Sequence, residues 1–239
     1  MKRINTPELL DTDACPPEEV AISLRDMARI NRWFGGVSTT VELVRRVART
    51  TGKTRLSLLE VAAGLGELPE IAAQKLALEG ISVNVTLLDR ARTHLPPVSR
   101  AVAADALALP FSDGAFDLVS CNLFAHHLEP EELILFVKEA LRVSRSALLI
   151  NDLVRHPIHV VLVYAGFPLM RSHVSRVDGV ASVRRAYLPE EIQQILTSIS
   201  TEPKPRIEVF RHPLFRMGIT LWKPSNQSNL TPSTPRPPG

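Results

Sequence analysis

The 239-residue sequence predicts a doubly wound α/β fold built on a mostly parallel sheet. Apolar runs alternate with helical patterns between residues 55 and 152, as expected when helices cover both faces of a parallel sheet. The run "LLEV" at 58–61 leads into a small-residue turn that ends at Gly66. A second run, "VNVTLL", ends at Asp89 and leaves room for one helix between the two strands. This spacing is typical of a βαβ unit that binds a nucleotide-like ligand.

The hydrophobic pattern places the individual elements in order along the chain. Apolar residues recur at helical spacing over 17–34, and a second helix over 38–52 is expected to be capped by Ser38 or Thr39. We expect strands at 55–61, 83–89, 100–104, 117–122 and 146–152, with helices at 66–79 and 130–142. After residue 152 the pattern predicts an apolar helix or helix pair at 156–170, a short helix at 188–196, and an antiparallel hairpin from 205–211 and 214–222.

These elements suggest one main domain with additions at both ends. Residues 1–16 are expected to be a flexible leader, and 17–53 an N-terminal helical cover. The main domain spans 54–222 and contains a substrate-side helical insertion at 153–190. Residues 223–239 are rich in proline and are expected to be disordered.

Composition excludes several classes of protein. The 28 basic and 25 acidic residues nearly balance, and only 5% of residues are aromatic, so we expect no nucleic-acid partner. Cys15 and Cys121 lie far apart, which argues against a disulfide scaffold or a zinc site, and we expect no metal. Two free thiols and the absence of an apolar leader fit the cytoplasm. The uncharged stretch 156–170 is too short and interrupted to span a bilayer, but the apolar segment 158–170 would allow peripheral membrane contact.

The ends of the first two strands carry the first candidate ligand contacts. Glu60 ends the first strand, and small residues follow at Ala62, Gly64 and Gly66, where the backbone can approach a ligand closely. The helix that begins near Gly66 directs its free N–H groups toward the same place. At the end of the second strand, the carboxylate of Asp89 can accept hydrogen bonds from both hydroxyls of a ribose. Alternatively, Asp89 caps a helix or pairs with a neighbouring arginine.

The segment "AADALALPFSDGAFDLVSCNLFAHHL", residues 103–128, narrows the class of protein. Asp105 follows the third strand, where it could accept from an adenine amine, and Asn122 ends the fourth. With these residues the chain resembles the class I S-adenosylmethionine-dependent methyltransferases, which have a Rossmann-like fold. It resembles most the small-molecule branch that contains the ubiquinone and menaquinone C-methyltransferases. The resemblance covers about residues 55–152, and the hairpin fits it as well.

The resemblance implies S-adenosylmethionine as the cofactor and a location for each of its parts. The first turn would line the methionine half, the end of the second strand would hold the ribose, and the end of the third would contact the adenine. One departure is Ala62, since the family usually has glycine there. The implied cofactor residues are Glu60, Ala62, Gly64, Gly66, Asp89, Arg90, Asp105, Ala106 and Asn122.

A nicotinamide dehydrogenase is the alternative for a βαβ unit whose second strand ends in an acid. Its fingerprint requires a third small residue three places after the second glycine, and this chain has Pro69 there. That alternative also leaves the segment 103–128 without a role.

Candidate catalytic residues follow the fourth strand. His126 and His127 lie just past its end, near the expected methyl group, and histidine is the usual general base for a phenol, hydroxyl or activated carbon. Alternatively, the pair shapes the pocket or caps the next helix.

The insertion after residue 152 is expected to form the pocket for a small hydrophobic or aromatic substrate, such as a phenol, quinone precursor or polyketide. The acceptor would be oxygen or carbon. A catalytically inactive cofactor-binding regulator, or a protein or RNA methyltransferase, are the alternatives. The candidate substrate residues are Tyr164, His173, Arg184, Arg185 and Tyr187.

Overall fold

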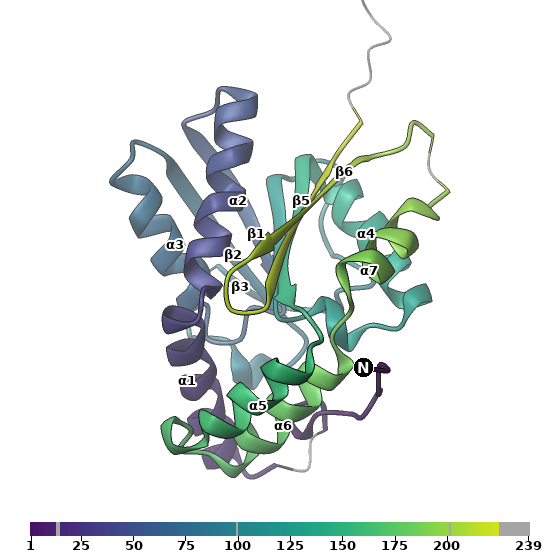
Figure 1. The fold of residues 1–239 in the computed structure, drawn as a ribbon. Helices are drawn as coiled ribbons and strands as arrows, with labels where there is room; N and C mark the ends of the chain where they lie inside the picture. The colour runs from purple at the N-terminus through teal and green to yellow at the C-terminus, as the bar shows by residue number, and fades with distance from the viewer. Residues whose placement is uncertain (13–14, 99, 201, 225–239) are drawn as a thin grey trace, which may run out of the picture.

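A computed structural model describes residues 1–12, 15–98, 100–200 and 202–224, which form a seven-stranded sheet with helices on both faces (Figure 1). The strand order is β3-β2-β1-β4-β5-β7-β6, and the first five strands of this order are parallel. The sheet confirms the doubly wound, mostly parallel α/β fold. The strands are β1 (Arg55–Val61), β2 (Ser82–Asp89), β3 (Ala101–Ala103), β4 (Phe116–Asn122), β5 (Ser144–Leu153), β6 (Arg206–His212) and β7 (Arg216–Trp222).

The helices lie close to where hydrophobic periodicity predicts them. Four are short 3₁₀ segments: η1 (Leu9–Asp11), η2 (Arg92–His94), η3 (Ala125–His127) and η4 (Phe167–Leu169). The α-helices are α1 (Pro17–Trp33), α2 (Gly36–Thr51), α3 (Glu67–Ala77), α4 (Pro130–Val143), α5 (Pro157–Ala165), α6 (His173–Arg185) and α7 (Pro189–Thr197).

Alternation along the central strands creates a core on each face of the sheet. On β1, Leu58 faces the side covered by α2 and α3, whereas Leu59 faces the side covered by α4 and α7. Leu118 and Val119 on β4 pair with these two residues in register and continue the same division. Both layers are buried, so the parallel strands lack a solvated face, which is why they read as continuous apolar runs.

The C-terminal hairpin forms one edge of the sheet, as the sequence predicts. β7 is antiparallel to β5, with Ile150 opposite Ile219, and β6 follows as the edge strand. Because β7 runs against the parallel strands, its first residue, Arg216, lies at the edge where β1, β4 and β5 end. The hairpin therefore adds a side chain to the edge that carries the candidate cofactor residues.

Two helical predictions need correction. Helix α2 begins at Gly36 rather than after Ser38 or Thr39, because Gly35 takes a left-handed φ of 84° and lets the chain turn directly from α1. Helix α6 is a separate element that the pattern does not reveal, because its buried positions include the polar residues Ser175 and Asp178. Both errors arise where buried residues are polar or where a glycine changes the chain direction.

The leader and α1 are tied to α6 by polar contacts, although the sequence predicts a flexible leader. The carboxylate of Asp178 accepts hydrogen bonds from the backbone N–H groups of Leu9 at 2.7 Å and Leu10 at 3.1 Å. Asp26 of α1 accepts in the same way from the N–H groups of Arg171 at 2.6 Å and Ser172 at 2.9 Å. Single polar residues make these contacts, so no periodic pattern in the sequence predicts them.

Two remaining predictions concern the tail and the membrane. Most of the tail expected to be disordered, 225–239, lies outside the described residues. Among the helices that the structure does describe, none is both long and apolar enough to cross a bilayer.

We predict that Gly66→Ala destabilises the fold more than Gly80→Ala. Both glycines have left-handed φ values, 72° and 80°, so each substitution costs about 1–2 kcal/mol in backbone strain. A Cβ on Gly66 would lie 2.4 Å from Leu87 Cδ1, whereas nothing lies within 4 Å at Gly80. Overpacking adds roughly 1–3 kcal/mol at Gly66 alone. Urea unfolding measures both losses, and equal losses would contradict the close packing of this turn.

Candidate functional site

A hollow of about 100 Å³ opens where β1 and β4 end beneath helix α1. It lies between the turn after β1, the start of α3 and the residues that follow β4. Helix α1 covers it with Leu24, Met27, Ala28 and Asn31. Five of the predicted cofactor residues line it, namely Glu60, Ala62, Gly64, Gly66 and Asn122.

The backbone around this hollow is strained on both sides. Ala62 after β1 and Leu123 after β4 each have a φ of 54°, a left-handed conformation that costs side-chain-bearing residues about 1–3 kcal/mol. Gly64 and Gly66 take the same region without that penalty. Ala62 therefore adopts the conformation that a glycine would adopt more easily. Two such residues facing one hollow support its choice as the candidate functional site.

Glu60 is a buried acid at the centre of the hollow's floor. Its carboxylate accepts a hydrogen bond from the Ser120 hydroxyl, and one at 2.6 Å from the Asn122 amide. Burial raises the pKa of Glu60 to about 7, although these two hydrogen bonds favour the charged form. Glu60 is therefore partly protonated near neutral pH, and a cation in the hollow would favour its ionised form.

A chain of hydrogen bonds continues from Asn122 toward the cover. The Thr40 hydroxyl donates to Asn122 at 2.7 Å, and the Asn151 amide donates to Thr40 at 3.0 Å. Arg216 then donates to Asn151 at 3.1 Å and also to Asn31 of α1. These hydrogen bonds join β4, α2, β5, β7 and α1. They therefore connect the floor of the hollow with α1, the helix that covers it as a lid.

Arg216 is a buried cation whose hydrogen bonds go only to neutral groups among the described residues. Besides the two asparagines, it donates to the carbonyl of Phe34 at 2.9 Å. Burial lowers its pKa to about 10, and the charge of Asp152 opposes this shift. The guanidinium remains charged at neutral pH and fixes the end of α1 to the sheet.

Asp89 fixes the shape of the first turn from the neighbouring strand. Its carboxylate accepts from the N–H of Gly64 at 3.0 Å and from the N–H of Ala91 at 3.0 Å, and His94 lies 3.5 Å away. Burial opposes the charge, but these partners hold the pKa of Asp89 below its usual value. An ionised carboxylate therefore stands at the end of β2, beside the glycine turn, where the sequence places a ribose contact.

The predicted adenine contacts lie one strand further along the edge. Asp105 follows β3, and its carboxylate accepts from the N–H of Leu107 at 2.8 Å, while Ala106 is half-buried beside it. Neither residue lines the hollow. Arg90 is exposed and donates to the carbonyl of Asp11 at 3.4 Å, so its side chain turns toward the leader.

His126 and His127 face a group of carboxylates, and neither lines the hollow. His126 lies between Asp152, at 2.6 Å from Nδ1, and Glu8, at 3.3 Å from Nε2. Burial opposes its charge, but these two carboxylates raise the pKa of His126 to about 10. A histidine that keeps its proton at neutral pH has no lone pair to offer, so this arrangement disfavours a general-base role.

The predicted substrate residues do not gather around one pocket. Tyr164 and His173 are exposed on α5 and at the start of α6, and Arg184 is exposed near its end. Arg185 is buried and donates to Asp11 at 2.8 Å and to the carbonyl of His127 at 2.6 Å. Tyr187 is buried too, and its hydroxyl donates to the carbonyl of Leu128 at 2.7 Å. These last two residues hold the segment after β4 in place.

Sequence reasoning missed the residues that reach the site from distant segments. Glu8 and Asp11 come from the leader, and no pattern around them predicts a buried position. Asp152 ends β5 and contacts His126, but a single acid at a strand end does not identify its partner. Arg216 is easier to find from the sequence than these acids. An arginine at the start of an otherwise apolar strand indicates a buried charge that requires hydrogen-bond partners.

Comparison with known families identifies the class of domain. A family described as the methyltransferase domain matches residues 59–147, which run from β1 into β5. No match was found among curated proteins. The matched segment includes Glu60, the glycine turn and Asn122, so it contains the sheet edge that lines the hollow. Residues 59–147 therefore form an S-adenosylmethionine-dependent methyltransferase domain.

Solved structures share this fold at low sequence identity. A SAM-dependent methyltransferase from Aquifex aeolicus aligns with a TM-score of 0.56 and 13% identity, over 87% of this chain and 99% of that one. The plantazolicin methyltransferase BpumL, in complex with a monoazolic desmethylPZN analog and SAH, aligns with a TM-score of 0.60 and 14% identity, over 87% and 95%. At these identities the likeness shows the Rossmann-like fold.

We predict that Glu60→Gln changes how stability depends on pH. Folded Glu60 keeps its proton up to about pH 7, whereas a glutamate in the unfolded chain loses it near 4.5, so unfolding releases a proton in this range. Its contribution to stability therefore falls as pH rises from 4.5 to 7, by about 3 kcal/mol in total. Glutamine removes this fall, so the variant should match the wild type at pH 4.5 and exceed it at pH 8.

Urea unfolding at both pH values measures the difference between variant and wild type. The control is Glu131→Gln, an exposed position on α4, whose difference from the wild type should not change with pH. A parallel pH dependence in wild type and Glu60→Gln would contradict the burial of an ionisable acid under the hollow.

Proposed function

We propose that this chain transfers a methyl group from S-adenosylmethionine to an oxygen or carbon atom of a small hydrophobic or aromatic molecule. The observation that carries the proposal is the hollow at the ends of β1 and β4, since it is built from residues that match the methyltransferase domain. Phenols, quinone precursors and polyketide-like molecules fit this substrate class, in line with the resemblance to the ubiquinone and menaquinone C-methyltransferases.

The residues around the hollow suit the methionine half of the cofactor. Gly64 and Gly66 have no side chains, and a Cβ on Gly64 would come within 3.6 Å of Leu24. A side chain at this position would therefore contact α1, so glycine keeps this wall of the hollow thin. Glu60 offers negative charge to a ligand that carries a sulfonium and an ammonium group. Its raised pKa means that cofactor binding should draw Glu60 into its ionised form.

Asp89 is suited to the ribose. Two backbone N–H groups already orient its carboxylate, and an ionised carboxylate has about four lone-pair sites, so acceptor capacity remains for two hydroxyls. Asp105 and Ala106 follow β3 beside it, and we assign the adenine to them. Asn122 ends β4 on the other side of the turn and would contact the amino-acid end.

Bound S-adenosylmethionine supplies an already electrophilic methyl group, so the protein has mainly to position the acceptor and exclude water. Leu24 and Met27 of α1 cover the hollow from above, and Leu123 closes it from the β4 side. The hydrogen-bond chain from Asn122 to Asn31 holds α1 in a fixed position over the ends of β1 and β4. For His126 or His127 to act as a base, Glu8 and Asp11 would first have to leave them.

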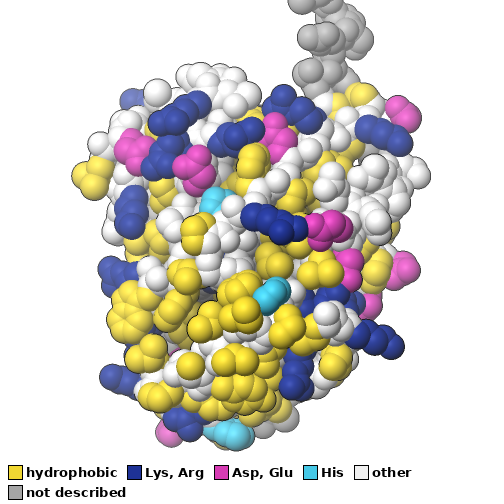
Figure 2. All heavy atoms as spheres, viewed as in Figure 1, with side chains coloured by type: hydrophobic (Ala, Val, Ile, Leu, Met, Phe, Trp, Pro, Cys, Tyr) yellow, Lys and Arg dark blue, Asp and Glu magenta, His cyan; other side chains and the backbone are white. Residues whose placement is uncertain are grey.

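An apolar surface near the site supports a hydrophobic substrate. Ile158, Val161 and Leu162 of α5 are 56%, 64% and 47% exposed, and Trp33 and Phe34 at the end of α1 are exposed as well. Figure 2 shows hydrophobic side chains gathered over the part of the molecule where α5 and α6 lie in Figure 1. Such a surface lets a poorly soluble molecule approach the sheet edge without leaving an apolar environment.

The same surface suits peripheral contact with a lipid bilayer, which we propose as the source of the substrate. Exposed arginines lie on neighbouring elements, at Arg32 in α1, Arg171 before α6 and Arg176 within α6. Apolar side chains that insert beneath the headgroups, with basic side chains beside them, are the pattern of an interfacial helix on an anionic membrane.

We predict that Asp89→Ala weakens binding of S-adenosylmethionine in calorimetry. Loss of hydrogen bonds to a charged group should cost about 1.5–3 kcal/mol, or roughly a 10- to 150-fold rise in Kd. Asp113→Ala is the control, since Asp113 is exposed and pairs with Arg142 far from the hollow. Equal affinity in Asp89→Ala and wild type would remove the ribose assignment. Transfer of a labelled methyl group to phenolic or quinone acceptors separates an enzyme from an inactive cofactor-binding regulator.

We predict that Val161→Asp reduces co-sedimentation with vesicles of anionic phospholipid by about tenfold or more. Inserting one apolar side chain contributes roughly 1.5–3 kcal/mol, and an aspartate adds repulsion from the headgroups. Leu78→Asp is the matched control, because Leu78 is 90% exposed at the end of α3, on another element. No binding by the wild type, or equal loss in both variants, would contradict membrane contact through α5.

A further inference from the structure

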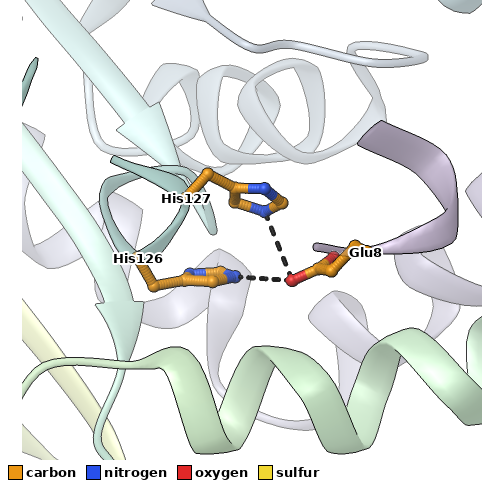
Figure 3. Close-up of side chains that lie close together, drawn as sticks. All are labelled: Glu8, His126 and His127. Carbon is orange, nitrogen blue, oxygen red and sulfur yellow. Dashed lines mark hydrogen bonds and ion pairs between the residues drawn. The ribbon is translucent and has the colours of Figure 1, made fainter. Parts of the chain in front are cut away.

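Three side chains from distant parts of the chain converge on one point near the end of β4 (Figure 3). His126 and His127 come from η3, and Glu8 comes from the leader. Glu8 Oε1 lies 3.3 Å from His126 Nε2 and 3.6 Å from His127 Nε2. Two ligands bound at about 2.0–2.1 Å to a tetrahedral zinc ion are roughly 3.3 Å apart, so both distances match shared coordination.

The far nitrogen of each histidine faces another carboxylate. His126 Nδ1 lies 2.6 Å from Asp152 Oδ1, and His127 Nδ1 lies 3.0 Å from Asp11 Oδ1. Metal-binding histidines almost always donate their second N–H to such a group, which fixes the ring and its tautomer. Here both rings are fixed so that both Nε2 atoms point at the same carboxylate oxygen.

Charge and burial also favour a cation. Glu8 and His126 are 5% and 1% exposed, so the point of convergence is nearly dry. Three carboxylates, those of Glu8, Asp11 and Asp152, contact the two rings, and Arg185 pairs with Asp11. With neutral histidines these groups carry a net charge of −2, which one divalent ion balances.

We propose that Glu8, His126 and His127 form a binding site for a zinc-class divalent cation, which fastens the leader to the end of β4. Imidazole nitrogens select zinc and its transition-metal neighbours over magnesium and calcium, which prefer oxygen ligands. Three protein ligands leave a coordination position for water or another donor. The sequence does not reveal this site, because the glutamate is separated from the histidines by more than a hundred residues.

The alternative occupant of this point is a proton. An ion pair between a protonated His126 and Glu8 would hold the same atoms together without any metal. The two cases differ in whether the protein takes up zinc and in whether uptake requires both Glu8 and His127, which makes them separable by direct binding measurements that do not depend on methyl transfer.

The test uses untagged full-length protein, treated with a chelator and then titrated with ZnCl₂ in calorimetry, with bound metal counted by elemental analysis. We expect one zinc ion per chain and no saturable binding of MgCl₂. Glu8→Gln and His127→Gln should each weaken zinc binding by more than about 100-fold. Asp11→Asn, which changes the partner of His127 rather than a ligand, should weaken it by about 10- to 100-fold. The matched control is His173→Gln, an exposed histidine at the start of α6, which should bind zinc like the wild type.

Limited proteolysis supplies a second measurement that follows the leader itself. Zinc should slow cleavage within residues 1–16 of the wild type, and should not slow it in Glu8→Gln. Circular dichroism confirms that each variant is folded, and His126 is left unchanged because it is fully buried. The proposal is overturned if the wild type binds no zinc, or if Glu8→Gln and His127→Gln bind it as tightly as the wild type.

Discussion

The buried carboxylate of Glu60 is the constraint around which the candidate cofactor edge is arranged. An acid at 1% exposure is tolerated only where hydrogen bonds compensate for lost water, and Ser120 and Asn122 supply them from β4. Those partners need partners in turn, since the Asn122 amide beside this carboxylate presents both donors and an acceptor. Thr40 and Asn151 meet that need. The position of one acid thus determines polar residues on three further elements.

The same chain of hydrogen bonds explains why the lid is placed so firmly. α1 contributes few buried apolar residues, with Leu24 as its main core contact, so packing alone holds it weakly. Arg216 compensates by bonding to Asn31 and to the carbonyl of Phe34, and Asp26 binds the start of α6. A buried charge that loses its hydrogen-bond partners strongly destabilises the fold, so these contacts fix the orientation of α1 as well as stabilising it. The strained turns at Ala62 and Leu123 persist because the lid and the floor are both fixed in this way.

The sequence predicts the fold well, and it predicts which candidate cofactor residues share one edge of the sheet, because both depend on local patterns. Strand ends, the glycine turn and Asp89 are encoded within about thirty residues, and parallel strands bring their ends together without further information. Long-range polar contacts are different. Nothing near Glu8 indicates that it meets His126, and α6 escaped notice because Ser175 and Asp178 occupy its buried face. The predicted substrate residues lie apart in the fold, and Arg185 and Tyr187 among them donate hydrogen bonds to the carbonyls of His127 and Leu128.

The histidine pair shows why the position of a residue does not settle its chemistry. Placement just past β4 suggests a base near the methyl group, and the chain does put His126 and His127 there. A base, however, needs an unprotonated nitrogen directed at the substrate, and both nitrogens of His126 are directed at carboxylates. These carboxylates belong to Asp152 of β5 and Glu8 of the leader, and the sequence around β4 does not reveal that either will contact His126. The residues that surround a histidine, rather than the strand that carries it, therefore decide whether it accepts a proton, holds one, or binds a cation.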